Sequence, residues 1–334
     1  MSANTSRTSP RASRRPFGQR FGLLAVVGAA GLLLAACGGS SNAFSSSSST
    51  SSSAAAGASG GADKTLVVGG ANFTEMSVME QLYGQLLAKN GYTVSYKQVE
   101  NREIYEPALE QGQIDVVPDY AATLANFISK KTGGTGDIAT ADANETVQKM
   151  QPLLTKLGLT ALTPSPAKDN NAFAVTKKYA EANNLKTLSD LAKVGKPIRL
   201  AATTECPDRP FCQPGLEKTY GLKVSQVLPL GFGSPQAKQA VTSGKADLVL
   251  TGTTDATLDQ LGLVLLQDDK GLQQADNIVP VVSKKANTPE VKALLDKLSA
   301  ALTTQDLTQL NAKVDAQRQT AQQVAKDFLA SKGL

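Results

Sequence analysis

The sequence predicts an α/β fold with two lobes around a cleft, and three observations indicate it. About 270 residues follow a low-complexity N-terminal region, which is enough for two compact lobes. Short apolar strands alternate with amphipathic helices twice along the chain, a pattern typical of mostly parallel sheets covered on both faces. Polar loops follow the predicted strands, where ligands of open α/β sheets lie.

The first run of alternation begins with a buried strand over 65–69. Thr74 then caps a helix over 74–90, with apolar residues at helical spacing, and Gly91 ends that helix. The elements expected next are a strand over 92–99, a helix over 103–111, a strand over 114–117 and a helix that ends near 130.

The second run repeats the pattern and ends in a helical section over 289–334. Before that section we expect strands over 172–176, 198–202, 227–230 and 246–251, with helices within 185–191 and over 214–220 and 235–243. Four loops follow predicted strands and are candidates for the cleft: 70–74, 118–123, 203–214 and 252–255.

The N-terminus predicts a bacterial lipoprotein signal peptide over 1–36. Five arginines and no acidic residue lie there, and its apolar stretch, 21–36, is too short for a typical membrane span. The stretch ends Leu-Ala-Ala-Cys, which resembles the lipobox, and the thiol of Cys37 would accept the lipid. A plain signal peptide with a chance cysteine is the alternative.

The mature chain is therefore expected to begin with a lipidated Cys37 and a flexible tether, 37–62, rich in Ser, Gly and Ala. Two acyl chains, with palmitate among them, would hold it stably on the extracytoplasmic face of the cell membrane. Removal of the five arginines lowers the formal charge from +5 to zero. The basic isoelectric point thus gives no support for a nucleic-acid partner.

The remaining cysteines, Cys206 and Cys212, lie close together in a proline-rich segment. Outside the cytoplasm we expect them to form a disulfide, and two buried free thiols are the alternative. The sequence has no histidine, which excludes Ser-His-Asp and Cys-His catalysis and leaves a poor ligand set for zinc. Phosphate-loop, dinucleotide and nucleophile-elbow motifs are missing too. A binding protein without catalytic residues, metal or cofactor is favoured over an enzyme.

Five stretches of the chain, in the same order, resemble the substrate-binding lipoproteins of osmoprotectant ABC importers, which take glycine betaine, choline or carnitine. The stretches are VGGANFTE at 68–75, ALEQGQID at 108–115, PDYAAT at 118–123, PGLEKTYGL at 214–222 and LQDDK at 266–270.

The resemblance implies a type II periplasmic-binding-protein fold, in which two hinge strands join the lobes around an interlobe ligand cleft. Lobe 1 would comprise 63–167 and 278–334, and lobe 2 would comprise 168–277. The resemblance also implies a monomer that closes on a small solute and delivers it to a membrane permease, which works with a cytoplasmic ATPase.

A quaternary ammonium has no N–H to donate, so aromatic faces must hold it, while a carboxylate on the same ligand calls for Arg, Lys or backbone N–H groups. The resemblance places Tyr120 and Thr123 on a cage tyrosine and a threonine, and Arg209 on a carboxylate-binding arginine. Phe173 stands near a further cage tyrosine. The other residues expected to bind ligand are Asn72, Phe73, Thr74, Thr253 and Asp276.

The match to the family's cage is partial. Asp276 stands where one cage tyrosine is expected, Thr251 or Gly252 where another is, and Ala71 replaces a lysine. A more polar ligand, or a cation paired with Asp276, would suit such a pocket. The same receptor fold with a polar or aromatic ligand, a lipoprotein enzyme, and a sensor or scaffold with a retired site stay open as alternatives.

Overall fold

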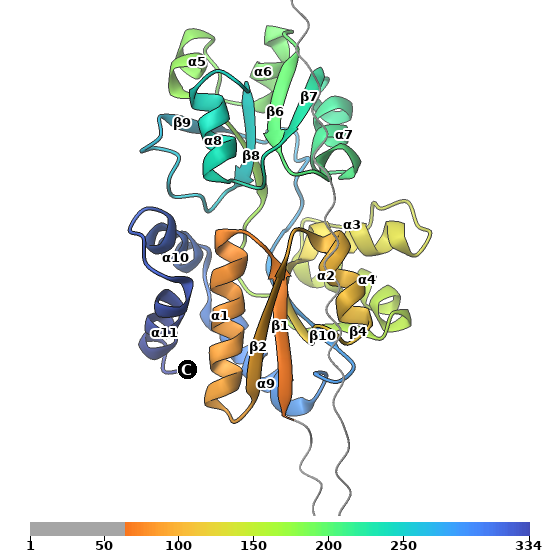
Figure 1. The fold of residues 1–334 in the computed structure, drawn as a ribbon. Helices are drawn as coiled ribbons and strands as arrows, with labels where there is room; N and C mark the ends of the chain where they lie inside the picture. Colours follow the sequence, from red (N-terminus) through yellow and green to blue (C-terminus); the bar gives the residue numbers. More distant parts are fainter. Residues whose placement is uncertain (1–63) are drawn as a thin grey trace, which may run out of the picture. The chain divides into compact units, whose positions relative to one another are not determined.

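The computed structural model describes residues 64–334, and these residues belong to one compact unit of the chain (Figure 1). The predictions for the signal peptide (1–36), for Cys37 and for the tether (37–62) lie outside the described residues. Two five-stranded sheets, each with its own helices, form two lobes. The two-lobed α/β fold is therefore confirmed.

The first lobe is built on a sheet with the strand order β2-β1-β3-β10-β4. Its strands are β1 (Thr65–Ala71), β2 (Thr93–Val99), β3 (Val116–Tyr120), β4 (Leu159–Ala161) and β10 (Ile278–Ser283). Its helices are α1 (Thr74–Lys89), α2 (Arg102–Glu110), α3 (Ala121–Lys131), α4 (Ala143–Lys156), α9 (Pro289–Ala301), α10 (Thr304–Asp315) and α11 (Ala321–Ser331).

The second lobe is built on a sheet with the strand order β7-β6-β8-β5-β9. Its strands are β5 (Asn171–Thr176), β6 (Ile198–Ala202), β7 (Val224–Pro229), β8 (Leu248–Gly252) and β9 (Leu263–Leu266). Its helical segments are α5 (Lys177–Ala182), α6 (Leu188–Val194), a 3₁₀ turn (Cys206–Asp208), α7 (Gln213–Gly215) with a π-helical turn (Leu216–Tyr220), and α8 (Pro235–Thr242).

The prediction of mostly parallel sheets is confirmed for four of the five strands in each sheet, but one strand in each, β10 or β5, runs the other way and makes the sheet mixed. β1 runs parallel to β2 and β3, but β10 runs antiparallel to β3 and β4. In the second lobe β6 runs parallel to β7 and β8, while β5 runs antiparallel to β8 and β9. Both β5 and β10 directly follow a segment that crosses from one lobe to the other. Each runs antiparallel to its neighbouring strands in the sheet that it enters.

Two crossing segments, 162–170 and 267–277, connect the lobes. They run antiparallel at one point, where Lys168 bridges Asn277 and the Asp169 amide donates to the Asp276 carbonyl at 3.1 Å. Neither the strands β4, β9 and β10 nor the helix α4 was predicted from the sequence, although β9 and β10 are short apolar runs of the kind that forms buried strands.

The helical section predicted over 289–334 is confirmed and consists of three helices. Each begins at a threonine whose hydroxyl accepts a backbone N–H of the first turn: Thr288 for α9, Thr303 for α10 and Thr320 for α11. An N-terminal cap satisfies backbone donors that a continuous helix would pair internally, so each threonine marks a new start. The cap predicted at Thr74 was wrong, because α1 begins at Thr74 with Phe73 as its N-cap.

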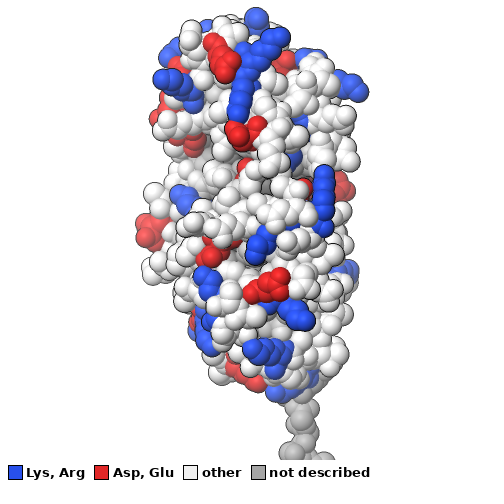
Figure 2. Space-filling view, turned by 90° about the vertical axis from the view of Figure 1, so that its left-hand side faces the viewer, with Lys and Arg blue, Asp and Glu red and all other residues white. Residues whose placement is uncertain are grey.

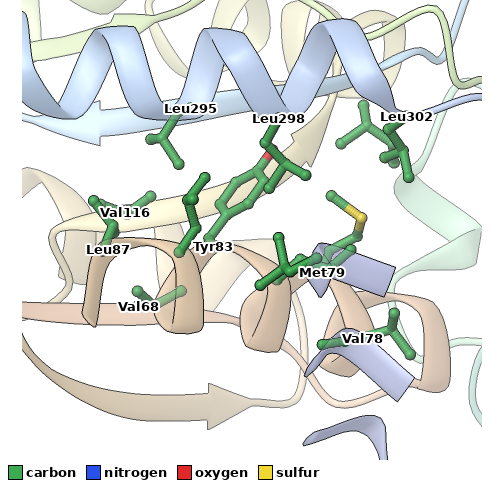
Figure 3. Close-up of a cluster of buried hydrophobic side chains, with 14 of the residues drawn as sticks. Val68, Val78, Met79, Tyr83, Leu87, Val116, Leu295, Leu298 and Leu302 are labelled. Atoms are coloured by element: carbon green, nitrogen blue, oxygen red, sulfur yellow. The ribbon is translucent and has the colours of Figure 1, made fainter. Parts of the chain in front are cut away.

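Apolar side chains fill both faces of each sheet. On one face of the first sheet, α1 and the three C-terminal helices bury a cluster that includes Tyr83, Leu87, Leu295 and Leu298 (Figure 3). Helices α2, α3 and α4 contribute to a separate cluster that includes strand residues such as Val117 and Val279. The packing of C-terminal helices against α1 makes the chain's end part of the first lobe (Figure 1).

The face of the molecule in Figure 2 carries acidic and basic side chains interspersed, without an extended patch of one sign. Among residues 64–334 no helix has the length and apolar character that crossing a membrane requires.

The Tyr83 hydroxyl lies inside the apolar cluster of Figure 3 and makes no hydrogen bond to another residue of the described chain. An unsatisfied buried hydroxyl costs about 1–3 kcal/mol, so we expect Tyr83→Phe to leave the free energy of unfolding unchanged or to raise it. Leu298→Ala in the same cluster should lower it by about 2–5 kcal/mol. Urea denaturation measures both, and a marked loss of stability in Tyr83→Phe would contradict the first expectation.

Candidate ligand-binding site

A cavity of about 1210 Å³ lies between the two lobes. Its walls come from the carboxyl ends of parallel strands in both sheets: the segments after β1, β2 and β3 in the first lobe, and those after β6 and β7 in the second. Because all of these strand ends point at the same space, loops far apart in the sequence converge there. The cavity is therefore the candidate ligand-binding site.

Three aromatic rings meet in this cavity. Phe73 follows β1 and lies 6.3 Å, centroid to centroid, from Tyr120 at the end of β3, with an interplanar angle of 25°. Phe73 also lies 5.2 Å from Phe232, which follows β7 in the second lobe. The three rings come from both lobes, so an aromatic surface forms only when the lobes approach each other.

Phe232 was not predicted from the sequence, although a signal for it exists. It stands between Gly231 and Gly233, directly after a strand, and both glycines have positive φ angles of 88° and 53°. Two residues in the left-handed region turn the chain sharply at no steric cost when they are glycines. A bulky aromatic held between such turns at a strand's carboxyl end points to a ligand role.

The first lobe supplies a buried charge network beneath the cavity. Arg102, at the start of α2, donates to Asp119 at 2.5 Å and to the Thr123 hydroxyl at 2.9 Å. The Tyr105 hydroxyl donates to the other oxygen of Asp119 at 2.9 Å. Because both charges of the ion pair are buried, each depends on the other and on these hydrogen bonds. Arg102 is thus committed to the protein rather than to a ligand.

Asp276 belongs to the crossing segment before β10 and reaches the cavity wall. Its carboxylate accepts the Thr123 backbone N–H at 2.8 Å, within the first turn of α3. Helix α3 has no side-chain cap of its own, so Asp276 satisfies one of its open donors from another part of the chain. Burial nevertheless raises the pKa of Asp276 to about 6.

Arg209 contacts the opposite lobe rather than an open part of the cavity. Its Nε and Nη2 atoms donate to the two carboxylate oxygens of Glu103 on α2, at 2.9 and 2.8 Å. Its guanidinium lies 5.9 Å from the ring centroid of Phe127. Burial by itself would raise the pKa of Glu103, but the hydrogen bonds and the charge of Arg209 hold that pKa below its ordinary value. Arg209 and Glu103 therefore form an ion pair that connects the two lobes.

The comparisons with known proteins agree with this architecture. Residues 64–331 match the family described as the substrate binding domain of the ABC-type glycine betaine transport system. The chain belongs to this family. Its members are substrate-binding components of transport systems, which implies a small-molecule solute and a membrane permease as partners, and the family is extracytoplasmic.

Individual relatives cover most of the chain. The glycine betaine-binding protein YehZ of Escherichia coli is 31% identical over 279 residues, which are 80% of this chain and 90% of that protein. A glycine-betaine-binding protein of Pseudomonas aeruginosa is 29% identical over 80% of this chain and 87% of its own length. The solved structure of apo YehZ has a TM-score of 0.55 at 28% identity and covers 80% of this chain and 99% of that one.

Six of the nine residues that the sequence analysis expects to bind ligand line the cavity: Asn72, Phe73, Tyr120, Thr123, Arg209 and Asp276. The other three lie elsewhere. Phe173 is buried in the core of the second lobe, because its position on β5 turns the ring toward Leu200 and its neighbours rather than toward the cleft. The Thr74 hydroxyl donates to Asp315 of α10 at 2.6 Å, and the Thr253 hydroxyl donates to Asp169 at 2.9 Å.

The disulfide between Cys206 and Cys212 is confirmed, which excludes the alternative of two free thiols. It closes the loop that carries Arg209, and Cys212 itself borders the cavity. Residues of this loop make two more contacts with the first lobe: Thr204 donates to Glu100 at 3.1 Å, and the Asp208 carbonyl accepts from Lys130 at 3.2 Å. The loop is the part of the second lobe that contacts the first lobe beside α2 and α3.

The buried ion pair under the cavity gives a stability test. Asp119→Asn would leave Arg102 buried without its counter-charge, so we expect the free energy of unfolding to fall by about 3–5 kcal/mol. Arg199 and Asp247 form the matched pair near the surface of the second lobe, and Asp247→Asn should change stability little. Chemical denaturation measures both variants, and similar losses in the two would contradict the expectation.

Proposed function

We propose that this chain is the extracytoplasmic solute-binding lipoprotein of an ABC importer, and that it binds glycine betaine or another small quaternary amine in the cleft between its lobes. The observation that carries the proposal is the meeting of Phe73, Tyr120 and Phe232 across the cleft. Aromatic faces attract a cation that cannot donate hydrogen bonds, at about 0.5–2 kcal/mol per ring. Membership of the glycine betaine family supports the same ligand class.

The charges around the cavity favour recognition through the cationic head of the ligand. Arg102 and Arg209, which could attract a carboxylate, are each held by a carboxylate of the protein. Asp169 and Asp276, both on the crossing segments, line the cavity without an ion pair to a described Lys or Arg. We therefore propose that Asp276 and the aromatic rings hold the ammonium group, and that a carboxylate on the ligand contributes less.

A second candidate is the same receptor with a larger polar or aromatic ligand. The cavity volume of about 1210 Å³ is more than a small osmolyte fills, and Asp276 stands where the family's pattern has a tyrosine. A binding panel that includes carnitine beside glycine betaine and choline separates the two candidates.

The remaining parts of the proposal concern how the receptor is placed. We propose a lipid anchor at Cys37, a tether over 37–62, and a monomer that presents closed lobes to the permease. The lobes that move would be 63–167 with 278–334, and 168–277. Mass spectrometry of the protein from membranes tests the anchor, since an unmodified N-terminus would contradict it.

Titration calorimetry with glycine betaine, choline and carnitine tests the ligand class. We expect micromolar or tighter binding of at least one of them, and Tyr120→Ala and Phe232→Ala should each weaken it by about 2- to 30-fold, as loss of one ring implies. Tyr96→Ala is the matched control, because Tyr96 is exposed outside the cavity. Equal affinities in wild type and both cavity variants would exclude the aromatic site.

The ion pair between Arg209 and Glu103 predicts how exchanging the two charges affects the affinity for the ligand. Arg209→Glu should weaken choline and glycine betaine equally, by up to about tenfold, because it opposes closure rather than removing a ligand contact. Glu103→Arg should do the same, and the double variant should recover most of the loss. If Arg209 instead binds the ligand's carboxylate, glycine betaine alone would suffer and the exchange would not restore it.

A further inference from the structure

Glu75 joins three parts of the structure that no local element connects. Its Oε1 accepts the hydroxyl of Tyr120, one of the three cavity rings, at 2.9 Å. Its Oε2 accepts the Thr254 hydroxyl of the second lobe and the Asn311 amide of α10, each at 2.7 Å. Glu75 lies in the first turn of α1 and is itself buried. Its carboxyl group therefore orients a ligand-facing ring and holds the opposite lobe at the same time.

Asp169 lies on the other side of this contact and is bonded to the second lobe. Its Oδ1 accepts the Thr253 hydroxyl and the Thr254 amide, both at 2.9 Å. Its other oxygen packs so tightly against Gly252 that a Cβ there would lie 2.3 Å away. The loop after β8 thus fixes the Asp169 carboxyl group, and Thr254 bonds to both acids.

The two carboxyl groups share the donor Thr254, whose hydroxyl bonds to Glu75 and whose backbone amide bonds to Asp169, and neither acid has a cationic partner. The groups that act on Glu75 are Tyr120, Asp169, Thr254 and Asn311, and none of them is basic. Those that act on Asp169 are Glu75, Thr253 and Thr254. Burial raises the pKa of Glu75, and burial followed by the charge of Glu75 raises the pKa of Asp169 well above its ordinary value.

We propose that Glu75 is a positioning residue for the ligand site, and that it shares one proton with Asp169 when the lobes close. This inference rests on the proposed function, because it concerns closure on a ligand. Two like charges cannot be buried together at low cost, whereas a carboxylic acid and a carboxylate can share a hydrogen bond. In the open state the two acids separate and regain water, so closure takes up a proton from solvent.

The sign of the pH dependence follows from this arrangement. The pKa of the pair is higher in the closed state than in the open state. The closed state is therefore fully favoured below the open-state pKa, and it loses this advantage as the pH rises through the closed-state pKa. Ligand affinity should fall with rising pH, by at most about tenfold per pH unit, which is the limit for one linked proton.

Calorimetric titration in buffers with different ionisation enthalpies measures the proton count directly. With glycine betaine and choline as the ligands, we expect a net uptake of up to one proton per ligand bound. Glu75→Gln and Asp169→Asn should each abolish the uptake and flatten the dependence of Kd on pH, because an amide donates to the remaining carboxylate without needing a proton. Zero uptake, or proton release, in the wild-type protein would overturn the proposal.

Two control variants assign the proton to the pair. Glu80→Gln changes another buried acid of α1, whose pKa burial raises to about 8, but Glu80 lines a separate small hollow against Tyr96 and Gln322. It should leave the uptake unchanged. Asp276→Asn removes another buried acid of the cavity wall, whose pKa burial raises to about 6. The uptake should persist in that variant even where affinity changes, and its loss there would assign the proton to Asp276 instead.

A measurement without ligand keeps this inference separate from the proposed function. Without ligand, the fraction of molecules in the closed state, reported by a fluorophore pair on the two lobes, should fall as the pH rises through the raised pKa of the pair, and Asp169→Asn should reduce this slope. If none of the three amines binds, the proposed ligand class fails while this slope still tests the pair. If an amine binds but neither the proton uptake nor the slope responds to Asp169→Asn, the shared proton is wrong and the ligand class stands.

Discussion

The organisation of the molecule depends on one topological constraint: the chain crosses between its lobes twice, and the two crossings run antiparallel. Asp169 donates its backbone amide to the carbonyl of Asp276, which fixes the two segments side by side. Each crossing feeds directly into a strand, β5 or β10, that enters its sheet against the direction of the parallel strands. The mixed sheets are therefore a consequence of the double crossing. The same pairing brings two acidic residues of the crossing segments, Asp169 and Asp276, to the cavity wall.

Ion pairs within the protein determine which charges the cavity leaves available to a ligand. Arginines near the cavity are neutralised by acids of the protein, Arg102 by Asp119 within one lobe and Arg209 by Glu103 across the cleft. A guanidinium that holds a carboxylate of the protein through two hydrogen bonds is a weak partner for a carboxylate of the ligand. What the cavity offers instead is aromatic surface and carboxyl groups, and that combination suits a cation.

Acids with little exposed surface differ in what compensates their charge, and two contrasting cases occur in the described structure. Asp119 and Asp255 each have a buried cationic partner, Arg102 and Lys238. Each of these ion pairs lies within one lobe, and each stabilises one fixed arrangement of side chains in that lobe. Glu75 and Asp169 have only hydroxyl and amide donors and each other, and they meet at the boundary between the lobes. A charge whose compensation depends on a shared proton can respond to lobe movement, whereas an internal ion pair cannot.

The sequence by itself determined the two-lobed α/β architecture, the alternation of most strands and helices, and the cysteine pair. Periodicity of apolar residues and the glycines that end helices are local signals, and they predicted β6 and α8 almost to the residue. Motif order also predicted that Phe73, Tyr120, Thr123 and Asp276 lie together, and all four line the same cavity. These features were predictable because the sequence signal for each lies within a few positions of the chain.

Only the tertiary structure decided which side chains face the ligand and which face each other. Phe173 turns into a core and Phe232 takes a place in the cleft, because strand register and a distant turn set their directions. Arg209 meets Glu103, 106 positions away, and Glu75 meets Asn311 across 236 positions. No local pattern encodes such contacts, since their energies arise from burial and charge in a space that forms only when both lobes are folded and brought together.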